Sequence, residues 1–177
     1  MTVKISGTDG IDTAQLRAPD GDPVALTIAN DGKVTVNVPQ SGAVLQEKFF
    51  TDGGNGNATN TPFKITADFT FVPKSTSSTV FISMVFEGSM DLASGVNPIG
   101  TFSIRNVDSN TQVGTNKRLN VSESSGGNSL IVPAAIAGFE ANTTLTSRRY
   151  ALYSQSDNTN SAATGRNVVC SIREVQN

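Results

Sequence analysis

The chain of 177 residues contains no histidine and no tryptophan, and it has a single cysteine. Without histidine, the Ser-His-Asp and Cys-His nucleophile systems, histidine-based zinc sites and the commonest general base are excluded. A single cysteine, Cys170, excludes an internal disulfide framework and a cysteine-rich metal site. Because Cys170 alternates with Val168 and Ile172, we interpret it as a small buried hydrophobe in a strand.

Charged residues are also scarce, at 16% of the chain, and the formal net charge is −2. A nucleic-acid interface needs clustered cations, and the doublets Lys117–Arg118 and Arg148–Arg149 are too sparse to supply them. No apolar stretch approaches the roughly 20 residues that span a bilayer, and the N-terminus lacks the apolar core of a signal peptide. We therefore expect no nucleic-acid partner, no membrane insertion and synthesis in the cytoplasm of the cell.

The residues that remain abundant are Ser, Thr, Asn and Gly, which favour strands and tight turns over long helices. Residues 63–87 show two runs of period-two alternation joined by a Pro/Ser-rich turn, which predicts two half-buried strands. The positions predicted to face the core are Ile65, Ala67, Phe69 and Phe71, then Val80, Ile82, Met84 and Phe86. Phe81 and Val85 fall on the opposite face, so we expect that face to be covered, for instance by another subunit.

Residues 1–40 differ from the rest in their sequence pattern and are predicted to be an N-terminal attachment segment. Three Asp-Gly pairs, at 9–10, 20–21 and 31–32, favour tight turns, and ALTIANDGKVTVNV predicts a β-hairpin around Asn30-Asp31-Gly32. So short a segment cannot bury a core of its own. The apolar side chains that we expect to make the attachment are those of Ile5, Ile11, Leu16, Val24, Leu26 and Ile28.

Residues 41–177 are predicted to form one all-β domain, an antiparallel β-sandwich of jelly-roll type. Pro133 is expected to end a short strand at 129–132, and AAIAGFEA at 134–141 is the one segment expected to be helical. The other predicted strands lie at 43–50, 63–71, 78–87, 100–107, 111–114, 117–124, 144–154 and 167–175. The polar segments 51–61 and 154–165 are predicted to be surface loops.

The chain offers little catalytic chemistry. Its fifteen carboxylates are scattered through predicted turns and outer faces, so no pair can be singled out for glycoside hydrolysis, the remaining enzymatic alternative. Asp12, Asp20 and Asp22 could bind calcium, but the EF-hand spacing is absent and an Asp-rich turn ending at Pro23 is the favoured interpretation. We expect no catalytic residue, no metal and no cofactor.

The two polar loops are the predicted recognition surface, because binding residues usually lie on loops held by a rigid scaffold. Tyr150 and Tyr153 flank the second loop, and tyrosine suits carbohydrate or protein contact. The alternative, that Tyr150 belongs to the core, stays open here. The candidate binding residues are Asn55, Asn57, Asn60, Tyr153, Asp157, Asn158 and Asn160.

Three segments resemble bacteriophage tail-fibre and related virion proteins. They are the opening stretch Val3–Ile11, the run Phe71-Val72-Pro73-Lys74-Ser75 followed by Ser77-Ser78, and the closing stretch Val168–Val175. The resemblance implies a trimeric jelly roll akin in shape to the tumour-necrosis-factor and C1q group, with a structural role. It also implies other virion proteins of the tail, baseplate or capsid as partners.

Two uses of such a protein follow, both non-enzymatic and both in the virion. In the first, a tail-fibre or receptor-binding component attaches through residues 1–40 and presents its polar loops to a host-surface glycan or protein. In the second, a capsid decoration protein clamps the phage head. A cytoplasmic lectin-like or enzyme-associated sandwich is a third, different class.

Overall fold

The computed structural model divides the chain into two compact units, Met1–Ala43 and Val44–Asn177. Each unit is described by itself. The residues that the structure describes are 15–17, 24–28, 34–36, 41–54, 56, 59–91, 98–120 and 130–177.

The first unit contains a small antiparallel sheet in the order β1-β2-β3. Its strands are β1 (Gln15–Arg17), β2 (Val24–Ile28) and β3 (Val34–Val36). Leu26 lies opposite both Leu16 and Val36, so the predicted hairpin around residue 31 is confirmed. Ile5, Ile11 and the three aspartates of the calcium alternative lie outside the described residues.

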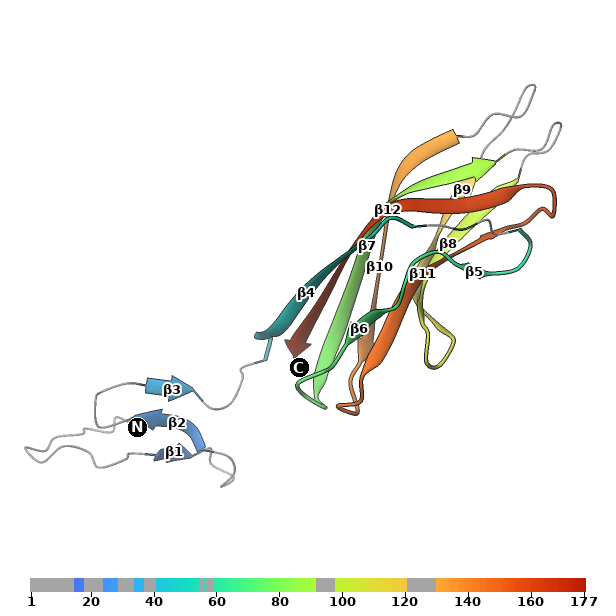
Figure 1. The fold of residues 1–177 in the computed structure, drawn as a ribbon. Coiled ribbons are helices and arrows are strands. Elements are labelled where there is room, and N and C mark those ends of the chain that lie inside the picture. Colours follow the sequence, from blue (N-terminus) through green and yellow to red (C-terminus); the bar gives the residue numbers. More distant parts are fainter. Residues whose placement is uncertain are drawn as a thin grey trace, which may run out of the picture. The chain divides into compact units, whose positions relative to one another are not determined.

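The second unit is a two-layered sandwich (Figure 1). Its strands are β4 (Val44–Asp52), β5 (Phe63–Lys64), β6 (Phe69–Phe71), β7 (Ser78–Asp91), β8 (Ile99–Asn106), β9 (Thr111–Asn120), β10 (Leu130–Ala141), β11 (Arg148–Ser156) and β12 (Ala162–Gln176). One sheet has four strands in the order β10-β7-β12-β4. The other has five strands in the order β5-β11-β8-β9, with β6 also paired to β11.

This strand order is that of a jelly roll. All the pairings are antiparallel, and the chain changes sheet at nearly every connection, as two interlocked Greek keys require. Among the described strands of the second unit, β8 and β9 are the one pair that is consecutive in the chain and also hydrogen-bonded in a sheet. The predicted fold class, an all-β antiparallel sandwich of jelly-roll type, is therefore confirmed.

The core lies between the two sheets. Phe86 of β7 packs on Phe102 of β8, with ring centroids 4.9 Å apart, and both rings are buried. All the predicted core positions of 63–87 are buried except one, and Cys170 is buried as expected. Burying apolar surface at this scale is what makes a domain of this size stable.

Ala67 is the exception, and its predicted inward orientation is wrong: it is exposed, whereas Thr66 is buried. The alternation shifts because the strand is interrupted between β5 and β6. There the Leu152 amide N–H donates to Thr66 Oγ1 (3.1 Å) and the Ala67 amide N–H to Asp52 Oδ2 (3.1 Å). Partners far away in the sequence therefore reset the register.

The predicted helical turn at 134–141 and the predicted strand end at Pro133 are also wrong. β10 runs through both, with Pro133 opposite Glu87 and Phe139 opposite Phe81. Proline is tolerated because β10 is an edge strand, where one side of the backbone needs no ladder partner.

Other predicted boundaries also change. β9 is one strand over 111–120 rather than two, and the extra residues at the register shift lie in β9, where the partner of Phe102 is Lys117 and that of Ile104 is Val113. The second polar loop is shorter than predicted, because β12 begins at Ala162 and leaves only residues 157–161 between the strands.

The two sheets come into close backbone contact where β9 meets β10. Gly114 has a positive φ of 77°, and a Cβ added there would collide with the backbone of Ala137 and Gly138. Only glycine combines that backbone angle with so short an approach. This contact fixes one side of the sandwich.

Candidate functional site

The outer face of the four-stranded sheet is the first candidate surface, and the register arranges its side chains in rows. One row reads Phe139, Phe81, Arg173 and Glu47, each opposite the next on the neighbouring strand. The following rows read Ala137, Ser83, Ser171 and Phe49, then Ala135, Val85, Val169 and Thr51. Apolar and small side chains therefore dominate the face, as predicted from Phe81 and Val85.

Large apolar side chains on this face are open to solvent. Phe49 is 70% exposed and Phe139 67% exposed, and Phe81, Val85 and Val169 are each about half exposed. Phe81 and Phe139 contact each other with ring centroids 6.0 Å apart. Isolated exposed apolar residues are ordinary, but a contiguous group of this kind marks an interaction site.

A shallow depression of about 450 Å³ lies within the face. Phe81 and Val175 line it together with the small side chains of Ser83, Ala137 and Ser171. The row of small residues thus forms a furrow beside the aromatic row.

The charges in the middle of the face neutralise each other. Arg173 Nη2 lies 2.9 Å from Glu47 Oε1, and Ser171 Oγ donates to the same oxygen at 3.1 Å. Glu87 and Arg166 lie opposite each other one row beyond Val85. The face presents no net charge from these two pairs.

The second candidate surface is one end of the sandwich. The strand directions bring the C-terminal ends of β4, β7, β9 and β11 to this end, and Val44 lies opposite Val175 at the other. The Ser156 amide N–H donates to the Thr59 carbonyl (2.8 Å), and Gln155 Nε2 donates to that of Asn60 (2.7 Å). The two predicted recognition loops are therefore adjacent. We refer to this region as the loop end.

The candidate loop residues differ in their hydrogen bonds and exposure. Asn60 and Asp157 belong to the joined loops, and Asp157 Oδ1 accepts a hydrogen bond from the Ile99 amide (2.7 Å). Asn158 Oδ1 accepts from the amide of Asn160, whose own side chain is exposed. Asn55 and Asn57 lie outside the described residues.

The two tyrosines lie within β11 rather than in the loops. Tyr153 is half-buried on the five-stranded sheet, with the Arg105 guanidinium 5.4 Å from its ring centroid. Tyr150 is fully buried and donates its hydroxyl hydrogen bond to Glu140 Oε2 at 2.7 Å, so the core interpretation of Tyr150 is the correct one. Burial, followed by this hydrogen bond and the charge of Glu140, raises the pKa of Tyr150 well above its usual value.

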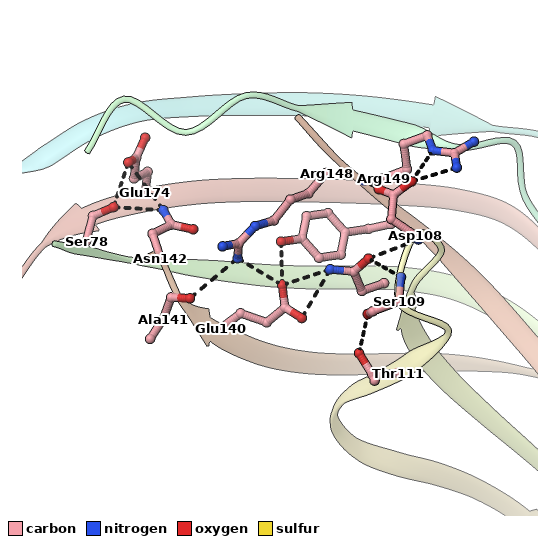
Figure 2. A network of polar contacts seen from close by, with 12 residues as sticks. Ser78, Asp108, Ser109, Thr111, Glu140, Ala141, Asn142, Arg148, Arg149 and Glu174 are labelled. Carbon is pink, nitrogen blue, oxygen red and sulfur yellow. Dashed lines mark hydrogen bonds and ion pairs between the residues drawn. The ribbon is translucent and has the colours of Figure 1, made fainter. Parts of the chain in front are cut away.

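A buried carboxylate, Glu174, lies near the other end of the sandwich (Figure 2). Its oxygens accept hydrogen bonds from Ser78 Oγ (2.6 Å), Gln46 Nε2 (2.7 Å), Asn142 Nδ2 (3.4 Å) and the amides of Lys74 and Ser75. Burial alone would raise the pKa of Glu174, but hydrogen bonds from Ser78, Lys74 and Gln46 outweigh it and lower the pKa. The network ties the β6–β7 turn to the last strand.

Glu140 forms a second polar centre beside the first (Figure 2). It accepts hydrogen bonds from Tyr150, Asn106 and Arg148, the last with Nη1 3.3 Å from Oε2. Neither glutamate was predicted from the sequence to face inward. For Glu174 a signal was present, because it follows Cys170 and Ile172 at the same period of two.

These glutamates have structural partners that account for their oxygens. Among the residues that the structure describes, no group of three or more His, Cys, Asp or Glu side chains is placed to hold a metal ion. Over the same residues, no helix is long and apolar enough to cross a membrane. Cys170 is buried, and burial raises the pKa of its thiol to about 12.

Comparison with known proteins identifies no family. No family model matches the chain, and no curated protein matches it. The solved structure of dimeric latent PorU from Porphyromonas gingivalis aligns at a TM-score of 0.42 and 8% identity over 79% of this chain and 14% of that one. The structure of infectious bursal disease virus, Gx strain, aligns at a TM-score of 0.28 and 12% identity over 99% of this chain and 45% of that one.

The VP2 subviral particle of infectious bursal disease virus aligns at a TM-score of 0.27 and 11% identity, over 93% of this chain and 42% of that one. The chain thus spans less than half the length of each of these three proteins. At such scores the alignments carry no argument about function, and the assignment of the jelly roll depends on the strand order alone.

Proposed function

We propose that the protein is a non-enzymatic bacteriophage virion structural protein, a tail-fibre or receptor-binding component. Residues 1–40 attach it to the particle, and the loop end faces a host-surface glycan or protein. The observation that carries the proposal is the polarity of the second unit. The second unit begins at Val44, which lies at the end of this unit opposite the two adjacent polar loops.

This polarity suits a protein that is held at one end and binds at the other. The antiparallel ladders run the length of the sandwich and give the loops a rigid support. Asn60 is exposed there and Asn158 is half-buried, and side-chain amides both donate and accept hydrogen bonds, as sugar hydroxyls and peptide groups require.

Capsid decoration is the second candidate. The exposed apolar face of the four-stranded sheet supports it, because such a face is suited to binding capsid subunits. Labelled protein, added to virions of the encoding phage that lack it and imaged by electron microscopy, separates the two. Label at the tail tip supports the receptor-binding proposal. Label over the head shell establishes decoration and overturns it, and binding to neither site overturns the virion role itself.

A variant lacking residues 1–40 serves as the control for attachment. We expect it to lose the particle label. A chain altered at the loop end, with Asn60→Asp and Asn158→Asp, should keep the particle label and lose adsorption of the particles to host cells.

A further inference from the structure

The outer face of the four-stranded sheet carries an inference that does not depend on where the protein lies in a virion. We infer that this face is the surface through which copies of this chain associate with one another. The residues concerned are Phe49, Phe81, Val85, Phe139 and Val169 with the furrow of Ser83, Ala137 and Ser171, and we call them the association face.

The size of the association face fits a protein partner. A phenylalanine carries roughly 150–250 Å² of surface, so three that are about half or more exposed, with the two valines, offer on the order of 400 Å². Patches of roughly 300–600 Å² mark functional surfaces on monomers, and a stable interface takes about 800 Å² from each partner with its polar rim included. The exposed apolar group is therefore sufficient as the core of an interface.

Charge favours a second copy over a foreign partner. Interfaces between different proteins are commonly specified by complementary charges, whereas identical surfaces that meet must not repel each other. Arg173 and Glu47 pair within one chain at 2.9 Å, so two such faces meet without net charge in their middle.

Shape supports the same partner. The association face holds a ridge, Phe139 and Phe81, beside a furrow of small side chains. A face that contains both elements can receive the ridge of one copy in the furrow of another, because large side chains pack against small ones.

The test is the mass of the full-length protein in solution, measured by light scattering over a range of concentrations. The expected result is an assembly of several 18.5 kDa chains, and three chains would also agree with the trimer that the resemblance to virion proteins implies. Phe139→Asp should shift the mass to that of one chain. The matched control is Leu145→Asp, which changes a similarly exposed apolar residue outside the face and should keep the assembly.

A labelling experiment covers the case in which Phe139→Asp fails to fold. Ser83→Cys places a thiol in the middle of the association face, and Ser147→Cys places one in the exposed β10–β11 connection. In the assembled protein a maleimide should react slowly with the first and rapidly with the second, while Cys170 is buried. A monomeric mass at every concentration overturns the inference. It does so even if the thiol of Ser83→Cys reacts slowly with the maleimide, because the cover over the face would then be residues 1–43 of the same chain. Rapid labelling of Ser83→Cys in an assembly overturns it as well.

Discussion

The two outer faces of the sandwich cover the same core but differ in chemistry. On the five-stranded sheet, Arg105 stacks on Tyr153, and Arg149 pairs with both Asp68 and Asp108. On the four-stranded sheet the outer face is mostly phenylalanine, valine, alanine and serine, with Arg173 paired to Glu47. The first face pairs these charged side chains with partners on the same sheet or its connections. The second exposes apolar surface that water does not favour, so the comparison indicates which side of the molecule needs a partner.

The largest effect on stability is expected when the hydrogen-bond network around Glu174, on the inner side of the four-stranded sheet, is disrupted. Glu174→Gln takes the charge from a carboxylate that accepts hydrogen bonds from Ser78, Lys74 and Ser75. We expect a loss of about 3 kcal/mol in the free energy of unfolding, because hydrogen bonds to a buried charge are strong and their donors are left poorly paired. Urea denaturation measures it, with Glu47→Gln on the outer face as the control, which should lose much less.

The pH dependence of the same network has a definite sign. The pKa of folded Glu174 lies below its ordinary value of 4.5, so the folded state binds its proton less readily than the unfolded state. The stabilisation is therefore fully present above about pH 4.5 and is lost as the pH falls through the folded-state pKa. Wild type and Glu174→Gln should converge in stability under acid, and a constant difference down to pH 2 contradicts this account.

A smaller effect is expected where the two sheets meet. Gly114→Ala imposes a side chain on a positive φ and drives its Cβ into the backbone of β10. The expected loss is about 2 kcal/mol, typical of strained backbone conformations. Gly53→Ala is the matched control, since nothing lies near its Cβ position, and its thermal unfolding should stay close to wild type.

The smallest effect is expected on the five-stranded face. Arg149→Ala breaks ion pairs with Asp108 and Asp68, but the arginine is well exposed and water screens such pairs. The hydrogen bond from Arg149 lowers the pKa of Asp108, and removing the arginine should return that pKa toward its usual value. NMR titration of Asp108 reports the change, while the midpoint of urea denaturation should barely move. A large loss of stability would show that this face depends on its charges after all.

The sequence predicted the layer structure well where the pattern was local. Val80 to Phe86 alternate with a period of two, and a strand converts that pattern directly into an inner and an outer face. The exposed outer face at Phe81 and Val85 followed from the same pattern. The strand over 134–141 could not be found this way, because its alanines carry no strand preference and Gly138 is explained only by its contact with β9.

The remaining misses have the same origin in contacts between distant residues. Ala67 faces outward because the Asp52 side chain and the Leu152 backbone hold this part of the chain. The donors around Glu174 come from β4, from the turn before β7 and from the segment after β10. The alternation in the sequence indicates that Glu174 points inward, but it does not identify the hydrogen-bond donors that surround its carboxylate.

The buried Cys170 has a consequence for how the domain responds to oxidising surroundings. With a pKa of about 12 its sulfur remains a protonated thiol at neutral pH, and oxidants react with the thiolate. A change from reducing to oxidising surroundings is therefore expected to leave this thiol unmodified while the domain stays folded.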